Sequence, residues 1–327
     1  MTGSGQGGAG GHDAKRADAV EMAAGRLHGG AAELDAAQGS LGELAGFRSG
    51  FVTVVGRPNV GKSTLVNRML RAKVSITSAS PNTTRTRVRG ILEGDGYQGV
   101  VVDTPGIHRP RSALGERLNE TASAALHDVD VCILVVDATS AIGPGDRYVA
   151  ACLPDASVVA VNKVDRASPT QLLGQLARAS EELGLERAEY FPVSARTGDG
   201  VAELVDHVVG RLPPGPRYYP AGTVHDVPEA FHLGELVREQ LLRVAREELP
   251  HSIACRVTEW DPPYVRCEVL VERESQKAIV VGRGGSVLKA AGIAARRSLP
   301  EGTYLDLVVK VERDWQRRPD VIERLGY

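Results

Sequence analysis

Short apolar runs separated by polar or glycine-rich stretches dominate the chain from residue 51 onward. Five of these runs have the length of a buried strand, and they alternate with helical segments: residues 51–55, 100–102, 131–136, 158–161 and 190–193. Continuous apolar strands are typical of a mainly parallel sheet that is covered on both faces. The pattern therefore predicts an α/β domain with helices on both sides of the sheet.

One strand at the sheet edge is predicted to be antiparallel. Two further runs between Arg85 and Val102 flank the sequence Glu93-Gly94-Asp95-Gly96. Glycine paired with an acidic residue is a strong signal for a tight hairpin turn. A hairpin at the edge of the parallel sheet is the simplest arrangement.

A proline-rich stretch, Leu212 to Pro216, ends the alternating pattern. Proline fixes φ and removes a backbone donor, so residues 213–220 are predicted to be a linker after a domain at 50–212. Beyond it the pattern of apolar and polar residues differs, and residues 221–327 are predicted to form a small α+β domain. Its expected elements are a helix at 232–249, strands at 253–257 and 265–271 joined by a turn at 261–263, a glycine-rich loop, a helix at 286–298 and a strand at 304–311.

Residues 1–49 are rich in Gly, Ala and acidic residues and contain few large apolar side chains. Such a segment cannot bury enough apolar surface to offset its chain entropy. It is predicted to be a mostly disordered extension, with transient helix at most between residues 14 and 44.

Composition narrows the function only slightly. The net charge of −2 over 327 residues means that any nucleic-acid surface must be local. The four cysteines have neither C-x-x-C spacing nor a histidine cluster beside them, which favours reduced structural thiols over a metal site or disulfides. No signal peptide and no apolar run of about 20 residues is evident, so a soluble cytoplasmic protein is expected.

The strongest motif is a phosphate-binding loop at residues 56–63. It fits G-x-x-x-x-G-K-[ST], with an apolar strand before it and a helical pattern after it. Backbone N–H groups at a helix N-terminus bind phosphate oxygens, Lys62 is expected to reach the β- and γ-phosphates, and Ser63 to bind Mg²⁺. The predicted nucleotide contacts here are Gly56, Arg57, Pro58, Asn59, Val60, Gly61, Lys62, Ser63 and Thr64.

A second motif follows the strand at 100–102. Asp103 lies where the carboxyl end of a strand meets the ligand crevice, and it is expected to hold Mg²⁺ through water. The N–H of Gly106 is expected to bond the γ-phosphate. This motif adds Asp103, Thr104, Pro105 and Gly106 to the predicted nucleotide site.

A third motif predicts which base of the nucleotide is bound. In Asn162-Lys163-Val164-Asp165, the carboxylate of Asp165 can accept from guanine N1–H and the 2-amino group. Adenine offers no such pair of donors, so it would leave that carboxylate unpaired. Lys163 is expected to cover the base, and the backbone at Ser194-Ala195 to donate to the guanine oxygen. GTP and GDP with Mg²⁺ are therefore the expected ligands.

Two positions bear on hydrolysis. Thr84, or else Thr83, is expected to complete the Mg²⁺ ligands when γ-phosphate is present, from a loop that orders with GTP. Ile107 occupies the position at which Ras-like GTPases have a water-orienting Gln, so intrinsic hydrolysis is expected to be slow. The predicted catalytic residues are Lys62, Thr84 and Gly106.

A glycine-rich loop and local positive charge suggest RNA binding by the second domain. Gly282-Arg283-Gly284-Gly285 fits the G-x-x-G loop of KH modules, which clamps about four nucleotides. Six Lys or Arg residues face one acid between residues 273 and 297. The predicted RNA contacts are Lys277, Gly282, Arg283, Gly284, Gly285, Lys289, Arg296 and Arg297.

Taken with these motifs, the chain resembles the bacterial Era GTPase family over residues 48–327. The likeness also rests on Ser75–Ser78, Thr83-Thr84-Arg85, the run Val271 to Lys277 and the ending from Val309 to Tyr327. It implies a Ras-like G domain followed by a type II KH domain, with a short helix at 276–281 where β-branched residues alone favour a strand. It further implies a monomer that binds 16S rRNA near its 3′ end, acts in maturation of the 30S subunit and can contact the membrane peripherally.

Two other readings fit part of the sequence. A GTP-dependent module whose second domain binds a protein partner would have the same nucleotide motifs. A tRNA-modification GTPase of the same superfamily would also have them, but the chain lacks a C-terminal cysteine motif and an appended folate-type domain.

Overall fold

The computed structural model describes residues 46–327 apart from 79, 81–82, 108–111, 127–128, 245–251 and 300. The expected disorder over residues 1–49 therefore lies outside the described residues, except at its end. There the prediction was two residues too long, because the first strand begins at Arg48 and pairs with the strand that begins at Tyr97.

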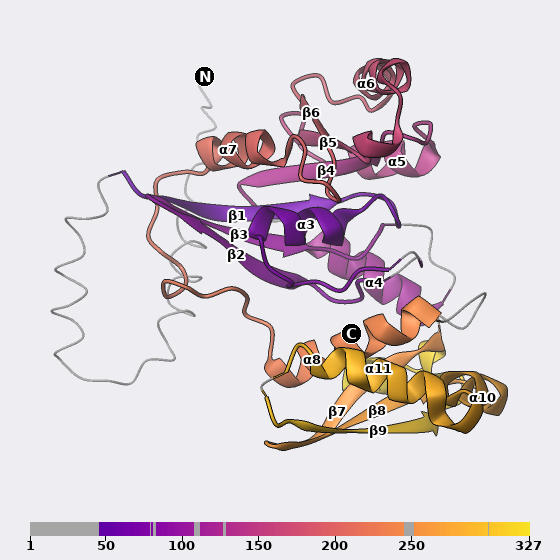
Figure 1. The fold of residues 1–327 in the computed structure, drawn as a ribbon. Coiled ribbons are helices and arrows are strands. Elements are labelled where there is room, and N and C mark those ends of the chain that lie inside the picture. The colour runs from indigo at the N-terminus through magenta and orange to yellow at the C-terminus, as the bar shows by residue number, and fades with distance from the viewer. Residues whose placement is uncertain are drawn as a thin grey trace, which may run out of the picture.

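A six-stranded sheet forms the first part of the molecule (Figure 1). Its order is β2-β3-β1-β4-β5-β6, and only β2 is antiparallel, as the hairpin at 93–96 predicts. The strands are β1 (Arg48–Val55), β2 (Val88–Gly94), β3 (Tyr97–Asp103), β4 (Val131–Asp137), β5 (Val158–Asn162) and β6 (Glu189–Val193).

Helices cover both faces of this sheet, as its apolar strands require. On one face, a core of buried side chains joins the sheet to α3 (Lys62–Leu70) and α7 (Val201–Arg211). On the other face, a second core includes residues of α4 (Ala113–Ala124), α5 (Pro144–Ala150) and α6 (Pro169–Glu182). The prediction of a covered, mostly parallel sheet is confirmed.

The segment after α7 runs back along the antiparallel edge of the sheet before the second domain begins. Gln98 accepts hydrogen bonds from the N–H groups of Tyr218 and Tyr219 at 2.8 and 2.9 Å. Further along, Ile91 N–H donates to Val224 O at 2.9 Å. The connection is thus fixed to the first domain beyond the proline-rich stretch.

The C-terminal domain is a three-stranded sheet with helices on both faces. Its order is β7-β8-β9, with β7 and β8 antiparallel and β8 and β9 parallel. The elements are α8 (Glu229–Val244), β7 (Ala254–Asp261), β8 (Tyr264–Val271), α10 (Glu274–Val281), α11 (Ser286–Arg296), β9 (Tyr304–Val311) and α12 (Pro319–Arg324). Helices α8, α10 and α11 lie on one face of the sheet and α12 lies on the other. The helix expected at 232–249 begins three residues earlier and is described as far as Val244, so the expected stretch 245–249 lies outside the described residues.

Two apolar clusters organise this domain. One joins the sheet to α8, α10 and α11. The other lies on the opposite face and includes Trp315, Ile322 and Leu325 together with Leu114 and Leu118 of α4. Because α4 belongs to the first domain, the second cluster is an interface between the domains (Figure 1).

One stretch of the described chain, Glu274–Arg296, is long and apolar enough to pass as a membrane span by length and composition. It is not one continuous helix, since α10 ends at Val281 and α11 begins at Ser286. Each helix is shorter than the roughly 20 residues that a bilayer requires.

Candidate functional site

The phosphate-binding loop lies between β1 and α3, at the carboxyl edge of the sheet. Gly56 and Gly61 have φ of 148° and 100°, which favours glycine. A Cβ on Gly56 would lie 2.5 Å from Val135 O, and one on Gly61 would lie 2.3 Å from Asn162 Nδ2. The two glycines are therefore required by backbone conformation and by close packing.

Lys62 is almost fully buried in this loop. Its Nζ donates to Gly56 O at 3.0 Å and to Arg57 O at 2.9 Å. Burial lowers the pKa of Lys62 to about 8, with the nearby Asp103 carboxylate acting against that shift. Phosphate oxygens would favour the charged form of this lysine.

Three oxygen-bearing side chains converge beside Lys62. Ser63 Oγ lies 2.8 Å from Thr84 Oγ1, and Thr84 Oγ1 donates to Asp103 Oδ2 at 3.2 Å. Asp103 is fully buried, and its Oδ1 has no hydrogen-bond partner among the described groups. Burial raises the pKa of Asp103, with the Lys62 charge acting against it. A divalent cation would satisfy the orphaned oxygen, and hard oxygen ligands are those that Mg²⁺ prefers.

The two threonines of this loop have different surroundings. Thr84 is the one that faces Ser63 and Asp103. Thr83 Oγ1 instead donates to Ser80 O at 2.7 Å and lies 2.7 Å from Ser78 Oγ. This geometry favours Thr84 over Thr83 as the metal ligand.

An open cleft of about 400 Å³ lies over these groups. Its lining comes from the phosphate-binding loop, from residues 76–78 and 83–84, and from Gly106. A Cβ on Gly106 would lie 2.8 Å from Pro58, so the two loops pack tightly. Thr104 fastens the second loop to β1 through a 2.8 Å hydrogen bond to Val54 O.

Ile107 is buried in the core on the α4–α6 side of the sheet. Its side chain is therefore packed among apolar residues and cannot orient a water molecule. The slow intrinsic hydrolysis expected from this position stays a prediction.

Asn162 braces the guanine-recognition loops. Its Nδ2 donates to Val60 O at 2.8 Å, and its Oδ1 accepts from Ala195 N–H at 2.9 Å. Ser194 N–H donates to Asp199 O at 2.8 Å. The backbone N–H groups of Ser194 and Ala195, from which a donor to the guanine oxygen is expected, thus donate to Asp199 of the same loop and to Asn162 at the end of β5.

Asp165 and Lys163 line the place expected for the base. Asp165 accepts from Ser194 Oγ at 2.6 Å and from Arg196 at 2.6 and 2.9 Å, and these hydrogen bonds lower its pKa. Lys163 Nζ donates to Asn59 O at 2.7 Å and pairs with Asp137 at 2.6 Å. Guanine would compete with Arg196 for the Asp165 carboxylate.

Sequence reasoning missed three side chains that fix this site. Asp137 at the end of β4 holds Lys163, Asp146 of α5 holds Arg57 at 2.6 Å, and Arg196 holds Asp165. An acid at the carboxyl end of an apolar strand was a signal for Asp137. Nothing local distinguishes Asp146 or Arg196 from ordinary surface charges.

The G-x-x-G loop joins α10 to α11 in the C-terminal domain. Gly282, Gly284 and Gly285 all have positive φ, of 73°, 58° and 78°. Arg283 and Gly284 are exposed, and an added Cβ on Gly284 or Gly285 would meet nothing within 4 Å. The loop is open to a ligand on the side of these two glycines.

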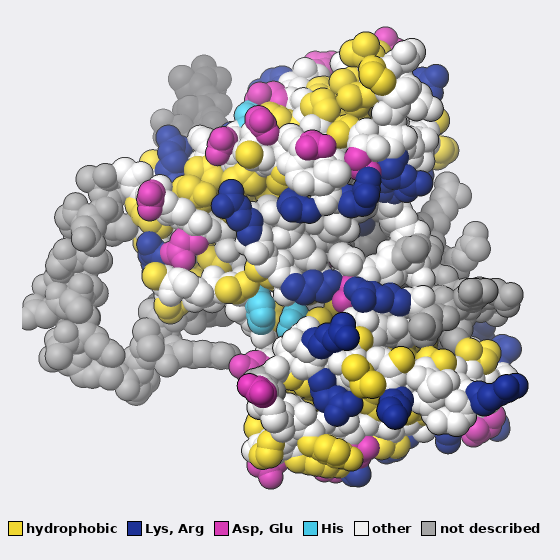
Figure 2. Space-filling model, viewed as in Figure 1, with side chains coloured by type: hydrophobic (Ala, Val, Ile, Leu, Met, Phe, Trp, Pro, Cys, Tyr) yellow, Lys and Arg dark blue, Asp and Glu magenta, His cyan; other side chains and the backbone are white. Residues whose placement is uncertain are grey.

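Cations surround this loop. Arg283, Lys289, Arg296 and Arg297 are exposed and Lys277 is half-buried, and none forms an ion pair with the residues that the structure describes. Figure 2 shows Lys and Arg side chains gathered over α11 and across the junction towards α3. Such unpaired charge suits a polyanion.

Together, the fold and the two sites define a GTPase of the P-loop class that carries a KH domain. Family models agree: one described as a 50S ribosome-binding GTPase matches residues 51–163, and a KH domain model matches residues 248–316. GTPase Era of Mycobacterium sp. (strain JLS) is 46% identical over 300 residues, covering 87% of this chain and 100% of that protein. GTPase Era of Mycobacterium tuberculosis (strain ATCC 25177 / H37Ra) is 46% identical over 298 residues, covering 86% and 99%.

Solved structures give the same result. A variant of Aquifex aeolicus Era bound to GDP and AlF4⁻ superposes with a TM-score of 0.81 at 35% identity, covering 86% of this chain and 99% of the other. Era in complex with MgGDPNP and nucleotides 1506–1542 of 16S ribosomal RNA has a TM-score of 0.82 at 35% identity, with the same coverage. The chain belongs to the Era family of GTPases.

Proposed function

We propose that this protein is a GTP-operated switch that binds 16S rRNA near its 3′ end and acts in maturation of the 30S ribosomal subunit. The observation that carries the proposal is the joining of a guanine-nucleotide site to an open G-x-x-G loop surrounded by unpaired cations. A relative of 35% identity binds nucleotides 1506–1542 of that RNA.

In the nucleotide site, each group has one role. Lys62 and the backbone N–H groups of the loop bind phosphate oxygens, and Gly106 N–H senses the γ-phosphate. Ser63 and Thr84 would hold Mg²⁺, with Asp103 acting through water. The metal, when bound, neutralises charge that develops on the phosphate oxygens.

In the C-terminal domain, the phosphate backbone of RNA would approach Gly284 and Gly285, where no side chain intervenes. Arg283, Lys289, Arg296 and Arg297 would neutralise phosphates. Ile279 and Ile293, which are 56% and 44% exposed, would lie beneath the bases. Few aromatic rings are nearby, so stacking is a smaller contribution than backbone contacts.

We further propose that the protein works as a monomer in the cytoplasm and contacts the inner face of the membrane peripherally. Its RNA partner is found in that compartment, and the peripheral contact follows from the family resemblance alone.

Binding of a labelled RNA from the 3′ end of 16S rRNA tests the main proposal. It is compared with GDP and with a non-hydrolysable GTP analogue, in the wild type and in a variant carrying Arg283→Asp and Gly284→Asp. Asp tolerates left-handed backbone, so the loop should keep its shape while its charge is reversed. We expect binding to be tighter with the GTP analogue and to be lost in the variant.

The matched control carries Gly174→Asp and Arg178→Asp on α6. Both positions are exposed, and an added Cβ on Gly174 meets nothing within 4 Å. This control changes the net charge equally and should bind RNA like the wild type. Binding that ignores both nucleotide and loop would contradict the proposal and favour a protein partner for the C-terminal domain.

A further inference from the structure

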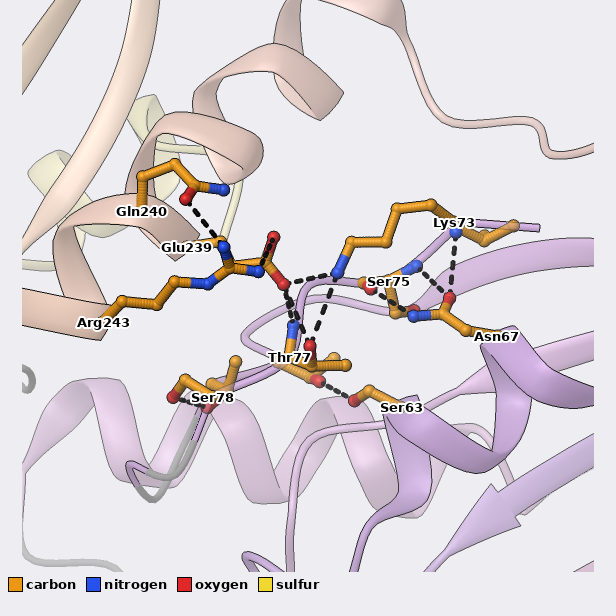
Figure 3. Close-up of polar contacts among 12 residues, drawn as sticks. Ser63, Asn67, Lys73, Ser75, Thr77, Ser78, Glu239, Gln240 and Arg243 are labelled. Atoms are coloured by element: carbon orange, nitrogen blue, oxygen red, sulfur yellow. Dashed lines mark hydrogen bonds and ion pairs between the residues drawn. The ribbon is translucent and has the colours of Figure 1, made fainter. Parts of the chain in front are cut away.

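The segment from Lys73 to Arg85 connects α3 to β2 and carries Thr84. Its described residues contact the C-terminal domain at three successive places: through Glu239, through Arg238, and through Ile253 with Trp315. Figure 3 shows the first of these, where Glu239 of α8 points into the cluster formed by Lys73, Ser75 and Thr77.

Glu239 is the main acceptor of this cluster, and its side chain is only 2% exposed. Its Oε1 accepts from Thr77 N–H at 2.7 Å and from Thr77 Oγ1 at 3.0 Å, and it forms an ion pair with Lys73. Burial alone would raise the pKa of Glu239, but the hydrogen bonds from Lys73 and Thr77 lower it below its ordinary value. A charged carboxylate from the C-terminal domain is therefore held in the first domain.

The same stretch is fixed from its other side by α3. Asn67 Oδ1 accepts from the N–H groups of Val74 and Ser75 at 2.9 Å, and Asn67 Nδ2 donates to Ser75 O at 2.7 Å. The backbone at 74–77 thus lies between Asn67 and Glu239, with hydrogen bonds to both. Losing Glu239 would free one of its two sides.

Arg238 and Arg85 fix the residues on either side of Thr84. Arg238 is fully buried, is held by Glu235 at 2.8 Å, and donates to Thr83 O. Arg85 Nη1 donates to Ile253 O at 2.8 Å, and its guanidinium lies 5.2 Å from the Trp315 ring centroid. Both neighbours of Thr84 are thus bound by the C-terminal domain.

Thr84 itself faces the opposite way. Because Thr83 and Arg85 are held from one side, the Thr84 side chain is directed to Ser63 Oγ and Asp103 Oδ2. A segment with few contacts of its own populates many conformations unless neighbouring groups fix it. Here those neighbouring groups come largely from α8.

We infer that Glu239 and Arg238 of the C-terminal domain are positioning residues for GTP hydrolysis, acting by holding Thr84 at the Mg²⁺ site. The inference rests on the GTPase activity and on the role proposed for Thr84. Thr84 is required only when γ-phosphate is present, so the GTP state and hydrolysis depend on these residues while GDP binding does not.

The packing between the domains does not depend on Glu239. Leu114 and Leu118 of α4 meet Trp315 and its neighbours in a separate apolar cluster. Replacing Glu239 should therefore leave the domains folded and docked, which makes a loss of hydrolysis informative.

Single-turnover hydrolysis at saturating GTP and Mg²⁺ tests the inference with Glu239→Ala, and GDP dissociation is measured beside it. Loss of a charge-assisted hydrogen bond predicts a fall in hydrolysis of about tenfold. GDP affinity should stay close to wild type, and Tm should fall by only a few degrees because the lost contacts are a small part of the free energy of unfolding. Glu229→Ala, an exposed acid on the same helix, is the matched control and should change neither.

A double-mutant cycle with Thr84→Ala shows whether Glu239 acts through that residue. Coupled residues give non-additive effects, so Glu239→Ala should slow hydrolysis little further when Thr84 is already replaced. Glu239→Gln, which keeps an acceptor for Thr77, should retain more activity than Glu239→Ala.

Three results would overturn the inference: unchanged hydrolysis in Glu239→Ala, additive losses in the cycle, or equal losses of GDP and GTP binding. A wild-type protein that hydrolyses no GTP would be a separate failure, of the GTPase activity itself.

Discussion

His225 and His232 form a ring pair at the point where the connecting segment meets α8. Their centroids lie 4.9 Å apart, and His232 also faces Lys73, Glu235 and Glu239. Burial lowers the pKa of His232, and the neighbouring His225 lowers it further, while the two glutamates act against the shift. The folded protein therefore favours neutral His232.

This pKa shift predicts that the folded protein is less stable in mild acid. When the folded pKa is below the unfolded value, the unfolded chain takes up the proton first. The contribution of His232 to the free energy of unfolding should thus fall as pH drops through its ordinary pKa of 6.5. Urea unfolding between pH 7 and pH 5.5 measures it, and His232→Phe should lose less stability over that range. An identical pH dependence in both proteins would contradict the prediction.

For single residues, sequence motifs predicted the groups that bind the nucleotide. Nucleotide binding depends on fixed local spacing of these groups, and such spacing can be recognised in a sequence. The phosphate-binding loop, Asp103 and Asp165 each follow a strand end. Most of the supporting residues could not be recognised from the sequence. Glu239 meets Thr77 across 162 positions, and Asp146 meets Arg57 across 89. Along the chain, each looks like an ordinary solvated charge.

At the level of the elements, the loop between α10 and α11 requires glycine for two different reasons, backbone conformation and close packing. At Gly282, φ is 73° and ψ is 171°, and an added Cβ would lie 2.6 Å from Val287 Cγ2. At Gly284, φ is 58° and ψ is 27°, and an added Cβ meets nothing. Gly282 is thus constrained by backbone and packing, and Gly284 by backbone alone.

Alanine substitutions should show this difference. Gly284→Ala adds only left-handed strain, about 1–2 kcal/mol. Gly282→Ala forces alanine into a backbone region that only glycine adopts readily, and it also adds a clash. Each of these effects lowers the free energy of unfolding by about 1–3 kcal/mol. Denaturant unfolding of the two full-length variants measures both losses, and equal losses would mean that α11 shifts freely to make room.

Helix α10 shows that local propensity can predict the wrong kind of element. Its β-branched Ile279, Val280 and Val281 favour a strand, and only the family resemblance predicted a helix. Gln276 Oε1 accepts from Arg273 N–H at 3.1 Å at the start of the helix, and Gly282 ends it. Packing of Val280 into the core of the domain then outweighs local preference.

For the whole molecule, the sequence predicted two domains but could not predict how they meet. The interface combines an apolar cluster at α4 with the polar contacts of α8, and each draws on residues from both domains. Amphipathic patterns show that a face is buried, and they do not show against what. Leu114 and Leu118 could equally have packed on the sheet of their own domain.

This interface should make unfolding of the two domains cooperative. Leu118 is 1% exposed and packs in the cluster with Trp315 and Ile322. Leu118→Ala removes apolar volume between the domains, at a cost of about 2–5 kcal/mol. Because that cost falls on the contact, the domains should begin to unfold separately.

Calorimetry with saturating GDP tests this cooperativity. GDP stabilises the first domain directly, and in the wild type it should raise the melting of the C-terminal domain as well, since the two are coupled. In Leu118→Ala, GDP should stabilise only the first domain, so a second transition should remain at lower temperature. Leu173→Ala, an exposed position on α6, is the control and should melt like the wild type. A single GDP-shifted transition in Leu118→Ala would mean that the polar contacts of α8 alone couple the domains.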